Sequence, residues 1–151
     1  MRKLLPLILI GLLCVGAKDY QAEVVRVLDG DTFYCRIETW PGDFKEISVR
    51  VYGIDTPEKE FPLGAIVKKY AQETIPTVAS KAISDRYKFI PAISVNNVRF
   101  DKYGRALGDV DVPGIGDWRN HMIEKGYAKP YEGGNREGLW KDCQLQMVTC
   151  E

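Results

Sequence analysis

Three short polar segments concentrate the carboxylates, arginines and lysine that could do chemistry in this 151-residue chain. They are residues 29–32 (Asp-Gly-Asp-Thr), residues 50–58, which run from Arg50 to Glu58, and residues 101–105 (Asp-Lys-Tyr-Gly-Arg). Each alone has a structural explanation, since Asp-Gly is common in hairpin turns and Asp-Thr-Pro-Glu can cap a helix. Strand alternation, however, places Arg50 on the same face as Tyr52 and Ile54, where a cation needs an anion beside it. We therefore interpret the segments together, as parts of one anion-binding site.

Together the three segments supply the groups that phosphodiester hydrolysis needs. Two carboxylates and a backbone carbonyl can hold a hard cation and leave room for water and a phosphate oxygen. A third carboxylate can orient or deprotonate the attacking water, and two guanidinium groups can neutralise the charge that grows on the phosphorane. The pattern indicates metal-assisted hydrolysis of a phosphodiester.

Other catalytic arrangements are absent from the sequence. The chain has one histidine, His121, which excludes mechanisms that need two, and we expect it to be a half-exposed helix residue. There is no Walker-type glycine-rich loop, and the cysteines do not have the spacing of a structural zinc site. Any catalysis must therefore use carboxylates, arginines, lysines or tyrosines.

The strings VLDGDTF, VRVYGIDTPE and DKYGRAL resemble the three active-site segments of the staphylococcal nuclease family, in order and closely in spacing. The resemblance covers about residues 23–131. It implies an OB-type barrel and a calcium-dependent endonuclease, a phosphodiesterase that acts on DNA, RNA or both.

The resemblance implies which residues hold one Ca²⁺ ion and prepare the attacking water. Asp31 and Asp55 match the calcium-ligating carboxylates of the family. Thr56 matches the residue whose main-chain oxygen completes the protein's share of the coordination. Glu58 matches the carboxylate placed beside the attacking water.

The resemblance also implies which residues hold the substrate. Arg50 and Arg105 match the two arginines that bind the scissile phosphate. Lys102 and Tyr103 match a pair that contacts the terminal phosphate of a bound nucleotide, and Tyr131 matches an aromatic residue near its base.

Two features depart from the family's founding member. That protein has two tyrosines two residues apart, whereas here Tyr127 and Tyr131 are four apart, so only Tyr131 is carried over, with packing at the mouth of the barrel as its alternative. The segment between Asp31 and Arg50 is also longer, which predicts an enlarged hairpin around residues 40–43. The site residues themselves are intact.

The elements that must position these segments follow from apolar periodicity and turn residues. We expect a hairpin over residues 20–36 that turns at Asp29-Gly30, strands over 47–54, 87–98 and 105–112, and helices over 63–83, 117–125 and 135–147. Pro76 predicts a kink or a break in the first helix. Five strands with one helix after the third predict an α+β, mainly β fold, a five-stranded OB-type Greek-key barrel with about three helices packed against it.

The first 17 residues have the pattern of an export signal. Arg2 and Lys3 precede the apolar run of residues 4–15, and small residues follow at the expected cleavage point. We expect a signal peptide over residues 1–17 and a periplasmic or secreted domain over residues 18–151. An uncleaved membrane anchor is the alternative, although the run is shorter than the roughly 20 residues that span a bilayer. Leu13 before Cys14 disfavours lipidation.

Removing residues 1–17 takes two cations and no acids from a balanced chain, which leaves 19 basic and 21 acidic residues and a net charge of −2. A nucleic acid must then be held by a local basic cluster rather than by an overall positive field. We expect a monomer. In an oxidising compartment Cys143 and Cys150 could form a disulfide, with free thiols as the equal alternative.

Two non-enzymatic interpretations remain beside the nuclease. A catalytically inactive OB-fold module could bind nucleic acid, but it has no need for three carboxylates, which repel phosphate unless a cation lies between them. A secreted domain that binds protein or carbohydrate needs an exposed aromatic surface. The three tryptophans, at positions 40, 118 and 140, are too scattered in the sequence to argue for one.

Overall fold

A computed structural model describes residues 19–78, 90–136 and 138–140 of the chain. Its elements, in chain order, are β1 (Tyr20–Asp29), β2 (Thr32–Trp40), β3 (Asp43–Val51), β4 (Ile54–Asp55), α1 (Pro62–Thr74), β5 (Ile93–Phe100), β6 (Ala106–Val112), β7 (Gly116–Asp117), α2 (Trp118–Glu124) and β8 (Lys129–Pro130). The expected signal peptide and the Cys143–Cys150 pair lie outside these residues. No helix of the described part is both long enough and apolar enough to cross a membrane.

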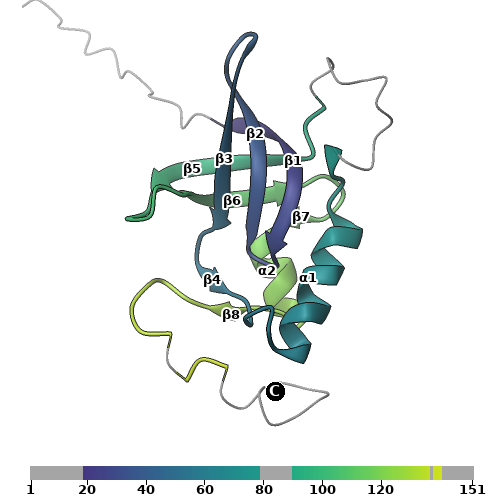
Figure 1. The fold of residues 1–151 in the computed structure, drawn as a ribbon, viewed down its shortest axis with the longest axis vertical. Coiled ribbons are helices and arrows are strands. Elements are labelled where there is room, and N and C mark those ends of the chain that lie inside the picture. The colour runs from purple at the N-terminus through teal and green to yellow at the C-terminus, as the bar shows by residue number, and fades with distance from the viewer. Residues whose placement is uncertain (1–18, 79–89, 137, 141–151) are drawn as a thin grey trace, which may run out of the picture.

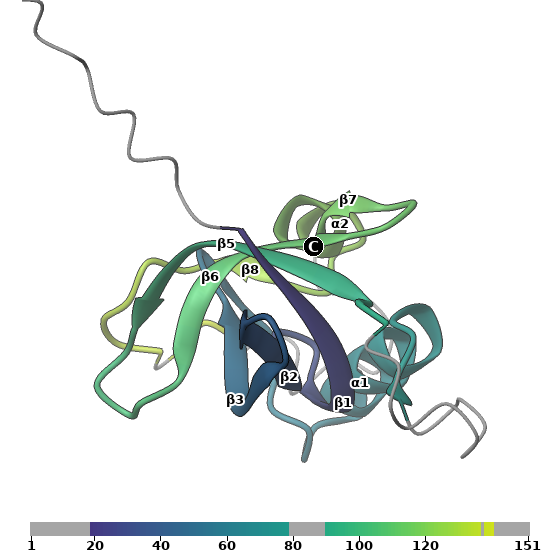
Figure 2. The same ribbon diagram turned by 90° about the horizontal axis from the view of Figure 1, so that it is seen from above.

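The five long strands form a closed barrel (Figures 1 and 2). The sheet order is β3-β2-β1-β5-β6-β7, and a parallel pairing between β3 and β6, with Val49 opposite Ala106, joins the two sides. A separate pair of short strands, β4 and β8, lies beyond the lower end of the barrel in Figure 1. The predicted α+β fold with a five-stranded OB-type barrel is confirmed.

The barrel interior is filled by alternate residues of the strands. On β2, Phe33, Cys35 and Ile37 point inward and are buried, and β6 buries every second residue from Ala106 to Val112. Burial raises the pKa of the Cys35 thiol to about 12, so this cysteine is an inert core residue. The period-2 alternation that predicted these strands is therefore the pattern that fills the core.

Two helices cover the barrel, and both are shorter than the sequence predicted. α1 ends at Thr74 with Ile75 as its C-cap, before Pro76, so the predicted break is found; residues 79–83 of the predicted helix lie outside the described chain. α2 begins after Asp117, whose side chain accepts a hydrogen bond from the Asn120 amide at 2.8 Å.

The third predicted helix does not begin at Asn135. Residues 135 and 136 are irregular and residues 138–140 form a turn, while 141–147 lie outside the described residues. The physical reason is the backbone of Gly138, whose φ angle of 89° a right-handed helix cannot contain.

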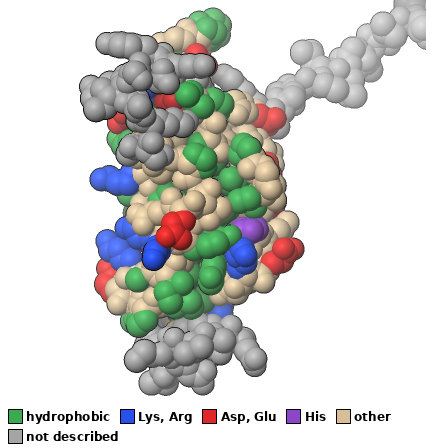
Figure 3. Space-filling model, turned by 90° about the vertical axis from the view of Figure 1, so that its right-hand side faces the viewer, with side chains coloured by type: hydrophobic (Ala, Val, Ile, Leu, Met, Phe, Trp, Pro, Cys, Tyr) green, Lys and Arg blue, Asp and Glu red, His purple; other side chains and the backbone are tan. Residues whose placement is uncertain are grey.

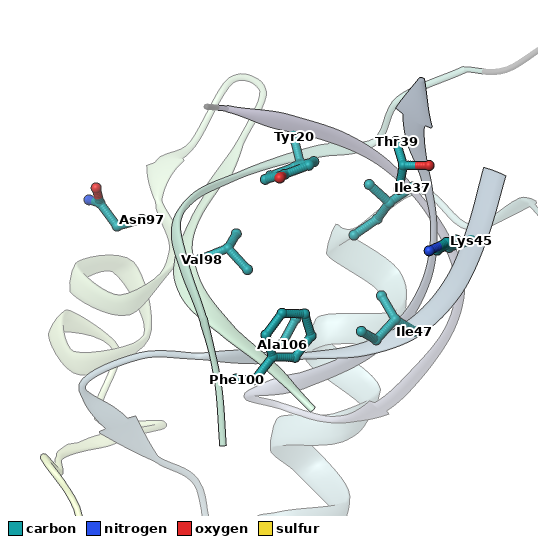
Figure 4. Close-up of a pocket in the computed structure, with 9 residues that line it drawn as sticks. All are labelled: Tyr20, Ile37, Thr39, Lys45, Ile47, Asn97, Val98, Phe100 and Ala106. Atoms are coloured by element: carbon teal, nitrogen blue, oxygen red, sulfur yellow. The ribbon is translucent and has the colours of Figure 1, made fainter. Parts of the chain in front are cut away.

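The two ends of the β2–β3 hairpin differ in character. At its turn, where Trp40 is exposed, the strands flank an apolar pocket of about 460 Å³ whose lining includes Tyr20, Ile37 and Phe100 (Figure 4). At the other end of the hairpin, Thr32 of β2, next to Asp31 in the chain, lies opposite Arg50 of β3. The polar chemistry of this hairpin therefore lies at the end far from the apolar pocket.

Surface charge is mixed on the face turned to the viewer in Figure 3, with basic and acidic side chains interspersed. His121 reaches this surface from α2; its Nε2 lies 2.6 Å from the Tyr70 hydroxyl and its ring stacks on Trp118. Burial, and then the charge of Lys125, lower the pKa of His121. Its partners are packing residues, in line with the half-exposed helix position that the sequence predicted.

Candidate active site

Asp31 lies in the turn between β1 and β2 and is buried. Its Oδ1 accepts a hydrogen bond from the Thr32 hydroxyl at 2.7 Å, and its Oδ2 accepts one from the Thr56 amide at 3.1 Å. Trp118 of α2 holds this turn, because its indole nitrogen donates a hydrogen bond to the Gly30 carbonyl at 2.9 Å. Burial raises the pKa of Asp31, and the neighbouring Arg50 opposes this.

Arg50, near the end of β3, joins the first segment to the second. One guanidinium nitrogen lies 3.0 Å from Asp31 Oδ1, and the other lies 2.9 Å from Asp55 Oδ1. The Arg50 side chain is only 12% exposed, so both of its ion pairs are shielded from water. The anion that the sequence required beside Arg50 is thus present as two carboxylates.

Asp55, on β4, is completely buried behind the cleft. Its Oδ1 is shared by Arg50 and by Arg136, which approaches to 2.7 Å, and its Oδ2 accepts a hydrogen bond from the Trp140 indole at 3.0 Å. Pairing of β4 with β8 brings the C-terminal segment to this position, with Asp55 opposite Lys129. Tertiary pairing, rather than local sequence, therefore supplies two of the three donors to Asp55.

Glu58 is the exposed carboxylate of the group, with 54% of its side chain accessible. Its Oε1 lies 3.0 Å from Arg136, and its backbone carbonyl accepts a hydrogen bond from the Phe61 amide at 3.0 Å. A Cβ at Gly64 would collide with that carbonyl, so only glycine lets α1 pack this closely against the turn. The turn that carries Glu58 is fixed while its side chain faces solvent.

Arg105 approaches from the turn between β5 and β6. Asp101 organises this turn, because its carboxylate accepts hydrogen bonds from the Tyr103 amide at 2.8 Å, the Arg105 amide at 3.0 Å and the Arg105 Nε at 2.7 Å. Burial acts to raise the pKa of Asp101, but these hydrogen bonds outweigh it and hold the pKa below its ordinary value. Arg105 keeps 34% of its side chain accessible.

Five of the six predicted catalytic and metal residues, from all three segments, line one cleft of about 280 Å³; they are Asp31, Arg50, Thr56, Glu58 and Arg105. Asp55 is hydrogen-bonded to Arg50 from behind this cleft. A second cleft of about 380 Å³ shares both arginines and is lined also by the predicted nucleotide residues Lys102, Tyr103 and Tyr131. Eight of the nine predicted residues therefore line two adjoining clefts, and the ninth, Asp55, is buried behind them.

Tyr127, the alternative to Tyr131, lies elsewhere. Its ring packs edge-on against Tyr70 at 5.1 Å and is partly buried against the core. Tyr131 lines the second cleft, and its hydroxyl donates to the Gly134 carbonyl at 2.8 Å. Of the two tyrosines, only Tyr131 faces the cleft with Lys102 and Tyr103.

Three residues of the site were not singled out from the sequence: Asp29, Arg136 and Trp140. Asp29 lines the carboxylate cleft, and burial first, then the charge of Asp31, raise its pKa. The DGDT motif could have indicated Asp29. Arg136 and Trp140 carried no such signal, because they belong to a segment that the sequence predicted to be a helix.

The predicted ligands have the chemistry that a hard divalent cation prefers. The residues predicted to hold it offer only carboxylate and carbonyl oxygens, and Asp29 adds a buried Oδ1 that has no hydrogen-bond partner among the described residues. A cation here would share Asp31 and Asp55 with Arg50. No group of three or more His, Cys, Asp or Glu side chains in the described part of the chain is arranged to hold a metal ion, so the predicted site depends on two carboxylates and the Thr56 carbonyl.

A sequence model of the family described as "Staphylococcal nuclease homologue" matches residues 48–147, which include Arg50, Asp55, Glu58 and Arg105. The chain belongs to this family. Two relatives from Escherichia coli O157:H7 and Escherichia coli, each named "Uncharacterized endonuclease", are 31% identical to it over 162 residues. Each alignment covers 94% of this chain and 92% of the relative. The family and the name of these relatives support the interpretation that this chain is a nuclease, a hydrolase whose substrate is nucleic acid.

Proposed function

We propose that this chain is an exported, calcium-dependent nuclease that hydrolyses phosphodiester bonds of DNA, RNA or both. The observation that carries the proposal is the convergence of Asp31, Arg50, Thr56, Glu58 and Arg105 on one cleft. Export is inferred from the pattern of residues 1–17 and is a separate part of the proposal.

Arg50 and Arg105 bind the scissile phosphate from two sides of the cleft. Arg50 is held by two buried carboxylates, whereas Arg105 is paired through Nε with Asp101 on a turn and keeps 34% of its side chain accessible. Positioned guanidinium groups stabilise the charge that develops on the phosphate oxygens, and they need little reorganisation to do so. Glu58, the most exposed carboxylate of the group, is the base that accepts a proton from the attacking water.

Asp31, Asp55 and the Thr56 carbonyl are the residues that would hold the cation. When bound, it supplies Lewis-acid polarisation of the phosphate and of the water. Calcium suits oxygen ligands in irregular geometry, whereas Mg²⁺ requires a tighter octahedron. The cleft holds the carboxylates of Asp29, Asp31 and Glu58, which would repel a phosphate in the absence of such a charge.

The second cleft would hold the nucleotide next to the scissile phosphate. Lys102 provides a cation for its terminal phosphate, and Tyr103 and Tyr131 provide aromatic surface for the sugar and base. The residues contact features that DNA and RNA share, which supports activity on both.

The proposal is tested by expressing the full chain and digesting single-stranded DNA, duplex DNA and RNA with Ca²⁺, Mg²⁺ or excess chelator. The double substitution Glu58→Ser and Arg105→Ala serves as the blank. We expect cleavage that requires Ca²⁺ and disappears in the blank. A folded protein that binds DNA but cleaves nothing would instead favour the inactive binding module. Mass spectrometry of the purified protein tests export separately, since loss of residues 1–17 is expected.

A further inference from the structure

Arg136 is a third arginine at the site, and it comes from the segment that follows β8 (yellow in Figure 1). Its guanidinium group forms a fork between two carboxylates, with one nitrogen 2.7 Å from Asp55 Oδ1 and the other 3.0 Å from Glu58 Oε1. The side chain lines both clefts and is 42% exposed. It therefore joins the buried carboxylate of the site to the exposed one.

The segment that carries Arg136 is anchored on both sides of it. Before it, the Tyr131 amide donates to the Gly53 carbonyl at 2.9 Å. After it, the indole of Trp140 is buried, donates to Asp55 at 3.0 Å and lies beneath the Lys129 ammonium group at 5.0 Å. The Leu139 amide donates to the Arg136 carbonyl at 3.1 Å. Arg136 is thus held in place by its backbone as well as by its ion pairs.

The Glu58 side chain contacts Arg136 through its carboxylate. The turn beneath Glu58 fixes its backbone, but in the described parts of the chain Arg136 is the only cation within ion-pair distance of its carboxylate. An exposed glutamate without a partner samples several rotamers, and this lowers the fraction of time in which its carboxylate faces the cleft. The two-point fork of a guanidinium group restricts this freedom in a way that a single ammonium group does not.

We propose that Arg136 is a positioning residue that holds the carboxylate of Glu58 at the cleft, with Asp55 as its own anchor. This inference rests on the proposed function, in which Glu58 is the general base. Because Arg136 acts through Glu58, its loss lowers kcat and leaves substrate binding almost unchanged.

The test is a double-mutant cycle in the full chain, with kcat and KM measured on one single-stranded DNA. Four variants are compared with the parent: Arg136→Gln, Arg136→Lys, Glu58→Gln and the double variant Glu58→Gln/Arg136→Gln. Arg26→Gln is the matched control, because it removes an exposed arginine of β1 that lies over the Tyr34 ring. Thermal denaturation of every variant shows which ones fold.

We expect Arg136→Gln to lower kcat on the order of tenfold, as for loss of a group that orients a functional side chain, with KM within about twofold of the parent. The kcat of Arg136→Lys is expected to lie between that of the parent and that of Arg136→Gln, because an ammonium group replaces only one arm of the guanidinium fork. In the Glu58→Gln background, removal of Arg136 is expected to have no further effect. The Arg26→Gln control retains the parent's kcat.

Three results would overturn the inference. Losses that multiply in the double variant would mean that Arg136 acts independently of Glu58, and a raised KM with unchanged kcat would make it a substrate ligand. If Arg136→Gln does not fold, a fully active Arg136→Lys would show that the fork is not needed. Failure of the proposed function looks different: Glu58→Gln alone would retain full activity, which removes the role of Glu58 and that of Arg136 with it.

Discussion

The two arginines predicted to bind the scissile phosphate lie in contrasting environments. Arg50 is 12% exposed and spans two buried carboxylates, whereas Arg105 is 34% exposed and pairs with Asp101 on a surface turn. The first is largely buried between two buried carboxylates, and the second is partly exposed on a turn. The ion pairs of Arg50 therefore contribute to the stability of the fold, whereas Arg105 can be replaced without disturbing the core.

This difference has a physical consequence for mutation. A charge removed from a buried network leaves its partners desolvated and unpaired, whereas a charge removed from the surface leaves partners that water can solvate. Substitutions on the Arg50 side should therefore change stability and activity together. Those on the Arg105 side should change activity alone.

The largest effect is expected for Arg50→Ala. It leaves Asp31 and Asp55 without their shared cation, although Arg136 and Trp140 still contact Asp55. We expect the free energy of unfolding to fall by about 3 kcal/mol, the lower end for breaking a buried ion pair, and the cleavage rate to fall about 10²-fold or more. Urea denaturation and cleavage kinetics measure the two quantities, and an unchanged denaturation midpoint would contradict the buried role.

Arg105→Ala should separate the two quantities. We expect kcat to fall about 10²-fold, while the free energy of unfolding changes by less than about 1 kcal/mol because the ion pair to Asp101 lies on a turn and is only partly buried. The same two assays apply. A loss of stability as large as that of Arg50→Ala would remove the contrast between the two sides.

Lys102→Gln should have a smaller effect, limited to binding. Lys102 lines the second cleft and not the one that holds the carboxylates. We expect KM to rise by roughly threefold to tenfold with kcat almost unchanged, as for a contact made equally in the ground and transition states. Steady-state kinetics on a short oligonucleotide with a terminal phosphate provide the measurement, and a fall in kcat alone would place Lys102 at the chemistry instead.

Asp29→Asn should raise stability slightly, and only above acidic pH. Burial and the charge of Asp31 raise the pKa of Asp29 in the folded state, so ionisation destabilises the cation-free fold as pH rises from the ordinary value of 3.8 through the folded pKa. With chelator present, we expect the variant to have the higher denaturation midpoint at pH 7. This advantage should shrink toward zero below pH 3.8, where both states are protonated, and an advantage independent of pH would show that charge is not its cause.

The sequence predicted most of the barrel because its strands are locally encoded. Alternating apolar residues and the turns at residues 29–31 and 41–42 define the first three strands to within a few residues. The helix predictions were less accurate, since composition alone extended the first helix past Pro76 and began another at Asn135, although Gly138 within it has a positive φ. Backbone conformation at glycine overrides helical composition.

Some residues of the candidate site could likewise be predicted from local sequence, and others could not. Asp31, Arg50 and Glu58 could be assigned from motifs because each segment carries its own residues in a fixed order. The ion pairs that Arg136 makes with Asp55 and Glu58 depend on β4–β8 pairing and join segments more than 70 residues apart in the chain. No local pattern encodes such contacts, so they required the structure.

The central claim is that the three segments form one cation-dependent hydrolytic site. The most direct test is the initial rate of single-stranded DNA cleavage as a function of free Ca²⁺, for the parent chain and for Asp31→Asn. The substitution preserves the shape of the side chain and removes its charge. We predict that the parent rate rises to saturation with Ca²⁺ and is abolished by chelator, and that Asp31→Asn needs far more Ca²⁺ or stays inactive. Equal rates for the two proteins at every Ca²⁺ concentration would contradict the account.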